Sequence, residues 1–181
     1  DIWRTSDGRF VVNHDGRADR VGGVRVDMET TPWELLREVV LYDTDGTKDR
    51  FDLRLPSLEN YLSICKKYEK HCVLELKSAF TPEEIAAIID VIKGYDYLEN
   101  VTFIRCKLNR IEMDYAAMNN VRFDNCFMDS SSFDFASGSA QFNNCHLHGA
   151  EFHHTLANLT FNCCSGEALE LNYCPDLTVN A

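Results

Sequence analysis

Apolar and polar positions change their period from segment to segment in the first half of the chain. Residues 10–14 form a β-rich run that follows the turn residues 6–8 and ends at a polar pair. Residues 16–31 contain glycines and charges without a clear period, so we expect a loop there. Pro32 suits the first turn of a helix, and the apolar positions after it have helical spacing. This part of the chain therefore predicts a strand, a loop and a helix in that order.

The following segments alternate between helix and strand in the same way. Ser57 suits the N-cap of a helical pattern, and residues 72–77 have the composition of a strand. Thr81 begins a capping box with a proline at the first helical position, and Gly94 is the expected C-cap. Residues 101–104 form the next strand-like run. Strands that alternate with helices of this length predict parallel βαβ units and an α/β fold.

From about residue 101 the sequence contains an internal repeat. A phenylalanine followed three positions later by a cysteine recurs at steps of 20, 19 and 19 residues. Repeats of this size predict a parallel β-solenoid, in which each coil of about 20 residues buries its apolar face against the next coil. We expect the phenylalanines to stack in one inward column and the cysteines in another. The repeated pairs are Phe103 and Cys106, Phe123 and Cys126, Phe142 and Cys145, and Phe161 and Cys164.

A shorter period of five residues lies within the coils, and it slips after Phe133 and again after Phe152. An alternative interpretation places part of the first register on one face of a helix, which leaves the start of the solenoid open between about residues 101 and 120. The five-residue positions are Phe103, Leu108, Met113, Met118, Phe123, Met128 and Phe133, and then Phe142, Leu147 and Phe152. The alternative helical face comprises Leu108, Ile111, Tyr115 and Met118.

Histidines and cysteines, which are residue types that bind metals, gather in the second half of the chain. The five-residue period points Cys145 and Leu147 inward but His146 and His148 outward, and ligands on opposite sides of a wall do not converge. We therefore favour small buried thiols over a structural zinc site. The gathered residues are Cys145, His146, His148, His153, His154, Cys163 and Cys164.

Composition and charge narrow the class of protein. With 181 residues the chain can bury a hydrophobic core, either as one domain or as two small ones. The formal net charge of −11, with no basic patch to oppose it, argues against nucleic acid as a partner. No apolar run approaches the roughly 18 residues of a transmembrane helix, so we expect no transmembrane segment. The localisation stays open between the cytoplasm and, if a signal peptide precedes Asp1, secretion.

Three motifs in the first part of the chain are similar to those of one enzyme family. Residues 1–15 contain an aspartate that leads into T-x-D-G, then a β-strand and then His-Asp. Residues 55–62 are similar to the pattern P-[ST]-L-E-E-x-L, and residues 74–77 are similar to an E-x-K strand. In this order and spacing, residues 1–105 resemble part of a glycerophosphodiester phosphodiesterase.

The resemblance implies a TIM-like (β/α)8 barrel with its chemistry at the carboxyl ends of the strands. It implies that His14 is a catalytic general acid or base, and that Lys77 is a second catalytic residue that offsets charge on the phosphate oxygens. Asp1 and Glu75 would be ligands of a Ca²⁺ or Mg²⁺ ion, since hard divalent cations prefer oxygen ligands. The family's His-Arg-Gly strand and a second metal-binding glutamate would precede Asp1, so the barrel is expected to be partial.

We therefore expect two domains and weigh two functions. Residues 1–105 would form a phosphodiesterase-like α/β domain that is truncated at its N-terminus. Residues 106–181 would form a β-solenoid that resembles pentapeptide-repeat and other right-handed β-helix proteins. The first hypothesis is a metal-dependent hydrolase that converts a small-molecule glycerophosphodiester into an alcohol and glycerol 3-phosphate. The alternative is a catalytically inactive binding or scaffold module, with a protein partner on the solenoid wall.

Overall fold

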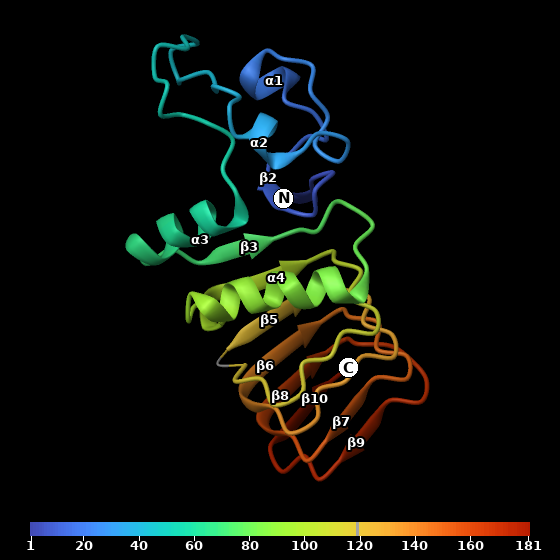
Figure 1. Ribbon diagram of the computed structural model, residues 1–181. Coiled ribbons are helices and arrows are strands. Elements are labelled where there is room, and N and C mark those ends of the chain that lie inside the picture. The colour runs from blue at the N-terminus through green and yellow to red at the C-terminus, as the bar shows by residue number, and fades with distance from the viewer. Residues whose placement is uncertain (119) are drawn as a thin grey trace. The chain divides into compact units, whose positions relative to one another are not determined.

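The computed structural model describes residues 1–118 and 120–181 (Figure 1). The chain forms two compact units. The first unit comprises Asp1–Lys67 and Leu76–Ala79, and the second comprises Tyr68–Glu75 and Phe80–Ala181. The boundary expected at residue 105, between a phosphodiesterase-like domain and a repeat domain, was drawn from sequence resemblance. It stays a prediction.

The first unit begins with an antiparallel hairpin of β1 (Ile2–Arg4) and β2 (Phe10–Val12). The Thr5 hydroxyl accepts the Arg9 N–H at 2.8 Å and donates to an Asp7 carboxylate oxygen at 2.5 Å, which fixes the turn between the strands. The strand predicted for residues 10–14 is confirmed over residues 10–12. Its neighbour β1 runs antiparallel to it, so this pair is not one of the expected parallel units.

Short helices follow the hairpin. The expected loop over residues 16–31 contains α1 (Asp19–Gly22), which sequence periodicity missed because a single turn is too short to show a period. Gly23 ends α1 with a left-handed φ of 63°, and a Cβ there would lie 2.2 Å from the Tyr42 hydroxyl oxygen. The helix predicted after Pro32 is confirmed only over α2 (Trp33–Leu36), with Pro32 as its N-cap. The prediction is wrong for Val39 and Val40, which lie beyond the end of the helix, and Val40 forms a bridge with Arg54.

The third helix of this unit also lies where the sequence predicts it. It is α3 (Leu58–Lys67), and the Ser57 hydroxyl accepts the Asn60 N–H at 3.2 Å before its first turn. The unit has its own hydrophobic core, so the hairpin and the short helices are held by packing and not by helix propensity alone. The buried core residues are Val11, Ala18, Met28, Leu36, Val39 and Leu55.

The second unit begins with one parallel βαβ unit, as the sequence predicts. β3 (Cys72–Leu74) pairs in parallel with β4 (Val101–Ile104), and α4 (Pro82–Gly94) and the 3₁₀ helix η1 (Leu98–Asn100) connect them. The capping box is confirmed, because the Thr81 side chain accepts the Glu84 N–H and the Glu84 carboxylate accepts the Thr81 N–H. The predicted C-cap is one residue early, since Tyr95 caps the helix.

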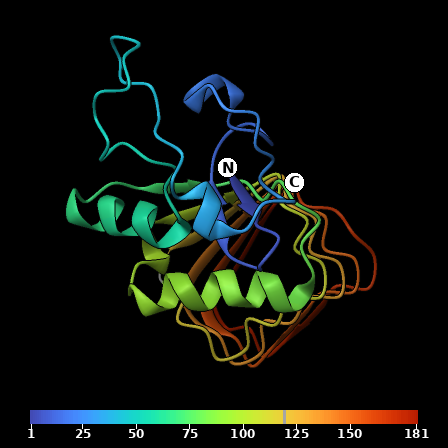
Figure 2. The same ribbon diagram turned by 45° about the horizontal axis from the view of Figure 1, so that its top comes forward.

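The rest of this unit is a parallel β-solenoid of about four turns. Its main wall continues the βαβ sheet, so that the described strands run in the order β10-β8-β6-β5-β4-β3. A second wall pairs β7 with β9 in parallel. The outlines of successive coils nearly overlap in Figure 2. The remaining strands are β5 (Val121–Asp124), β6 (Ser137–Asn143), β7 (Glu151–His153), β8 (Leu156–Asn162), β9 (Glu170–Asn172) and β10 (Leu177–Asn180).

The five-residue period is confirmed as the inward side of the coils. All ten predicted positions, from Phe103 to Phe152, are buried. The alternative helical face is wrong, because residues 105–118 form turns and isolated bridges, and Tyr115 is 75% exposed. Corner residues five apart adopt left-handed φ angles of 51° to 68°, which turn the chain from one wall to the next. In the first full coil these corners are Arg105, Arg110, Tyr115 and Asn120.

The slips in the five-residue period coincide with the long strands. β6 and β8 each have seven residues, and they pair in register from Ser137 beside Leu156 to Asn143 beside Asn162. Side chains alternate between the two faces of the sheet along β8, and along β6 after Gly138, which has a left-handed φ of 89°. In β8 continuous strand takes the place of a corner, and the step from Phe142 to Phe161 is 19 residues instead of 20.

The predicted phenylalanine column is confirmed and is the centre of the solenoid core. Phe103, Phe123, Phe142 and Phe161 stack in sequence, with ring centroids 5.5, 5.1 and 4.9 Å apart and ring planes within 12° of parallel. All four residues are buried. Because each coil is too small to enclose its own ring, the column forms only when the coils stack.

The cysteine column is also present, and its thiols take part in the backbone hydrogen bonding. The Sγ atoms of Cys126 and Cys145 donate to the carbonyl oxygens of Phe103 and Phe123 in the preceding coil, at 3.4 and 3.3 Å. The Thr155 hydroxyl donates to the Phe133 carbonyl in the same way, at 2.8 Å. A small side chain with a donor is therefore what these inward corners require.

We expect the cysteine column to make the solenoid sensitive to alkali. The hydrogen bond with the Cys106 thiol raises the pKa of Cys126 to about 12, and the hydrogen bond with the Cys126 thiol raises the pKa of Cys145 to about 12. An unfolded thiol, with a pKa of 9.0, loses its proton in a range where the folded one keeps it. The resulting stabilisation is therefore complete below about pH 9 and is lost between about pH 9 and pH 12.

The measurement is the urea midpoint of unfolding at pH 8 and at pH 10.5. Cys145→Ser keeps a donor for the Phe123 carbonyl, as Thr155 shows, but removes one titrating thiol, so its midpoint should fall less with pH than that of the wild type. Cys163→Ser, which changes an exposed thiol, is the control and should fall as much as the wild type. Equal slopes for all three proteins would contradict the prediction.

An amide ladder runs along the outer face of the main wall. The side-chain amide of Asn143 donates to Asp124 at 2.7 Å, that of Asn162 donates to Asn143 at 2.6 Å, and that of Asn180 donates to Asn162 at 2.7 Å. All donors point toward the carboxylate of Asp124, so the ladder ends on a charged acceptor. This ladder fixes the register of β5, β6, β8 and β10.

No helix in the two described ranges of the chain combines the length and the apolar character that crossing a membrane requires.

Candidate active site

Three of the four residues that the sequence singles out lie in the first unit. Asp1 precedes β1, His14 follows β2, and Lys77 lies in Leu76–Ala79, a short segment that joins the first unit although the residues on both sides of it belong to the second. Glu75 belongs to the second unit, after the end of β3, and is half-buried. The first unit therefore gathers residues from three separate places in the sequence.

Ile2 positions these three residues through its backbone. It pairs with Val12 on one side and with Leu76 on the other. The Lys77 N–H donates to the Ile2 carbonyl at 2.9 Å, and the Asn13 N–H donates to the Asp1 carbonyl at 3.1 Å. Because Ile2 itself is fully buried, Asp1 and the residues beside it are held at the edge of a packed hairpin.

Asp1 and Lys77 form an ion pair. The Lys77 Nζ lies 3.4 Å from an Asp1 carboxylate oxygen, and the side chains are 25% and 21% exposed. Such a pair keeps the ammonium group in place while leaving it accessible to an anion. Lys77 can therefore present a positive charge at this edge, which is the role that the sequence motif predicts.

His14 is held by a carboxylate that is itself held by a guanidinium group. The His14 Nδ1 lies 2.7 Å from one oxygen of Asp15, and the Arg20 Nε donates to the other oxygen at 2.7 Å. The hydrogen bonds from His14 and then from Arg20 hold the pKa of Asp15 below its usual value, so Asp15 stays ionised. We assign the Nδ1 proton to the bond with Asp15, which leaves Nε2 free to exchange a proton.

A pocket of about 360 Å³ opens beside this chain of contacts. Its lining includes Asp15, Arg17, Asp19 and Arg20 from the segment that leads through α1, and Asp27 from the segment that pairs with it. Three aspartates and two arginines line it, and the arginines are paired within it, Arg17 with Asp19 at 3.1 Å and Arg20 with Asp15 at 2.7 Å.

Asp15 and Arg20 are site residues that sequence reasoning missed. His-Asp was noted only as a motif, and Arg20 lies in a stretch where no period was visible. The signal that could have found them is the placement of a carboxylate directly after the histidine, since an ionised carboxylate is the usual partner that orients a catalytic imidazole. The position of Arg20 depends on α1, which the sequence pattern did not predict.

The roles of Asp1 and Glu75 as metal ligands stay a prediction. The Asp1 carboxylate is paired with Lys77, and Glu75 lies in the other unit. Within residues 1–118 and 120–181, no group of three or more histidine, cysteine, aspartate or glutamate side chains is placed to hold a metal ion. The Ca²⁺ or Mg²⁺ ion therefore stays a prediction, and we assign it no step in the chemistry.

The chain was compared with protein families, curated proteins and solved structures. No family model matches the chain, and no curated protein matches it. Among solved structures, the chain is similar to the crystal structure of a glycerophosphodiester phosphodiesterase from Parabacteroides distasonis ATCC 8503. The two are 15% identical with a TM-score of 0.46, and the match covers 95% of this chain and 77% of that chain. A likeness at this level carries no conclusion about fold or function.

Proposed function

We propose that this protein is a phosphodiester hydrolase that acts on glycerophosphodiesters and releases an alcohol and glycerol 3-phosphate. The observation that carries the proposal is that Asp1 and His14, from the first motif, and Lys77, from the third, belong to one compact unit, in which Lys77 pairs with Asp1. These motifs are among those that carry the resemblance to the phosphodiesterase family. The partial barrel that this resemblance implies stays a prediction.

The geometry supports a simple division of roles. A water oxygen forms a bond to phosphorus and the water releases a proton to the solvent, while the bond from phosphorus to the alcohol oxygen breaks. His14 gives its Nε2 proton to the leaving oxygen, and Asp15 stabilises the imidazolium form from which that proton comes. Lys77 offsets negative charge on the non-bridging oxygens of the phosphate.

The deciding experiment is an assay of the purified protein on glycerophosphocholine, with and without EDTA. We expect glycerol 3-phosphate and choline to appear, and we expect EDTA to stop the reaction if the predicted divalent ion takes part. Added Ca²⁺ or Mg²⁺ in excess of the chelator should then restore it. Turnover that EDTA leaves unchanged would contradict the metal requirement but not the hydrolysis. No product under any of these conditions would contradict the hydrolase.

A second candidate is the catalytically inactive binding module with a partner on the solenoid wall. One observation favours it, namely that the solenoid exposes large side chains in addition to those it buries, including Tyr115, Phe127, Phe135 and Tyr173. Surfaces of this kind are more typical of binding than of inert walls. The assay separates the two candidates, because an inactive module gives no product.

A further inference from the structure

A row of exposed aromatic rings runs along one corner of the solenoid. Tyr115, Phe135, His154 and Tyr173 occupy equivalent positions in successive coils, and we call them the aromatic row. Neighbouring ring centroids lie 5.1, 5.3 and 4.8 Å apart, and neighbouring ring planes differ by 5°, 8° and 5°. Each ring therefore covers one face of the next, and only the two end rings have a face left over.

Tyr115 is the first ring of the aromatic row. One of its faces stacks on Phe135, and no ring among the residues that the structure describes stacks on the other. The reason lies in the connection from β3 to β4, where α4 and η1 take the place of a coil that would carry the next ring. The row is thus interrupted at a defined point, with an open tyrosine face.

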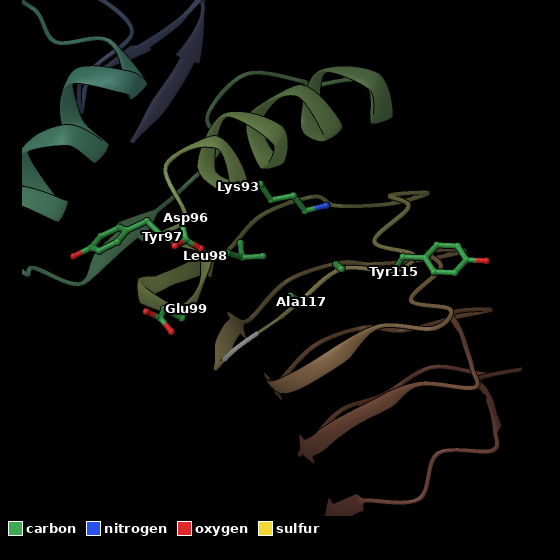
Figure 3. A pocket seen from close by; sticks show the side chains of 8 residues that line it. Lys93, Asp96, Tyr97, Leu98, Glu99, Tyr115 and Ala117 are labelled. Atoms are coloured by element: carbon green, nitrogen blue, oxygen red, sulfur yellow. The ribbon is translucent and has the colours of Figure 1, made fainter.

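A pocket of about 510 Å³ lies at this point (Figure 3). Tyr115 and the short side chains of Ala116 and Ala117 line one part of it, and the end of α4 and the residues after it line the rest. Ala116 is buried, whereas Ala117 is exposed and its short side chain leaves room that a larger one would fill. The pocket therefore borders the end of the row at Tyr115.

Charge is distributed unevenly along the pocket. The side chain of Lys93 extends from the last turn of α4 in the direction of Tyr115, whereas Asp96 and Glu99 lie at the opposite end (Figure 3). A ligand ring beside Tyr115 would therefore have a positive charge near it. A second negative group on the ligand would lie near the two carboxylates and be repelled by them, so a dianion should bind less well than a monoanion.

We propose that this pocket binds a planar aromatic monoanion, whose ring stacks on the open face of Tyr115 and whose negative group pairs with Lys93. The ring adds one member to the aromatic row at the spacing the row already has. This inference is independent of the proposed hydrolysis, because all residues of the pocket belong to the second unit.

The test is an NMR titration of the ¹⁵N-labelled full chain with 2-naphthoate. We expect the amide shifts to move in residues 93–99 and 115–117. The uncharged 2-naphthamide should bind several-fold more weakly, because it lacks the partner of Lys93. Cyclohexanecarboxylate should bind more weakly still, because it has the charge but no flat ring to stack.

Variants of the protein distinguish stacking on Tyr115 from non-specific binding. Tyr115→Ala should weaken the binding of 2-naphthoate about 5- to 10-fold, whereas Tyr115→Phe should keep it, since a stacked ring pair is worth about 1 kcal/mol. Lys93→Gln should remove the preference for naphthoate over naphthamide. Tyr173→Ala is the matched control, because Tyr173 is 79% exposed and ends the same row away from the pocket.

Three outcomes would overturn the proposal. Unchanged affinity in Tyr115→Ala, an equal loss in Tyr173→Ala, or shifts confined to residues outside the pocket would each contradict it. The three positions are exposed, so the variants should fold, and a thermal melt followed by circular dichroism checks this.

Discussion

Replacing Phe142 with aspartate is expected to unfold the solenoid. Phe142 is fully buried, with Phe123 and Phe161 stacked on its two faces and Phe133 and Phe152 against it edge to face, both at 5.6 Å between ring centroids. Loss of such a ring alone costs about 3–5 kcal/mol. The carboxylate would also be buried among rings without a partner, and an uncompensated buried charge costs about as much again.

The sum exceeds or equals the whole stability of many domains, which is about 5–15 kcal/mol. We therefore expect the far-ultraviolet circular dichroism of the strands and the resistance of residues 101–181 to proteolysis to be lost. Phe142→Ala gives a graded version, with an unfolding free energy lower by about 3–5 kcal/mol. Phe127→Asp is the matched control, since Phe127 is 51% exposed on the outer side of a coil. A Phe142→Asp protein as stable as this control would contradict the stacked core.

Replacing His14 with alanine is expected to abolish diesterase activity without loss of stability. General acid–base catalysis typically contributes about 10²- to 10⁴-fold to a rate, and kcat should fall by a factor in this range. The side chain of His14 is 70% exposed and is not part of the core of the first unit, so the urea midpoint should stay the same. The measurements are turnover of glycerophosphocholine and urea unfolding of the same preparation.

Two further variants locate the effect. His148→Ala changes an exposed histidine of the solenoid and should leave turnover unchanged. Asp15→Asn keeps a hydrogen-bond partner for His14 but removes its charge, so we expect a smaller loss of kcat than in His14→Ala. If turnover in His14→Ala equals that of the wild type, His14 is not the proton donor.

The solenoid could be predicted from the sequence because each coil repeats the same pattern of residues after 19 or 20 positions. Phe123 and Phe142 are neighbours in space only because they are one coil apart, and this separation is visible as a step in the sequence. Helix α4 could be predicted for a different reason, since its capping box and proline are local signals. The seven-residue strand β6 could not be predicted. A shortened spacing in the five-residue period looks like an irregularity of the repeat and does not indicate a longer strand.

The candidate site was predictable in its residues but not in its arrangement. Motifs marked His14 and Lys77, yet the pairing of Ile2 with both Val12 and Leu76 joins segments more than sixty positions apart and leaves no local signal. The antiparallel direction of β1 relative to β2 follows from a tight turn at Thr5 and Asp7, which the family resemblance does not encode. The orienting contact of Arg20 depends on a single helical turn, which is too short to show a period.

The in-register pairing of β5, β6 and β8 means that one coil can replace another. Ala140 lies beside Val121, and Leu159 lies beside Ala140. If residues 140–158 were removed as a block, Leu159 would take the position of Ala140 and every later side chain would keep its wall. A deletion of a few residues would instead rotate all later side chains onto the wrong wall. The length of this part of the protein can therefore change by duplication or loss of a short stretch of gene, one coil at a time, while the joint between coils stays the same.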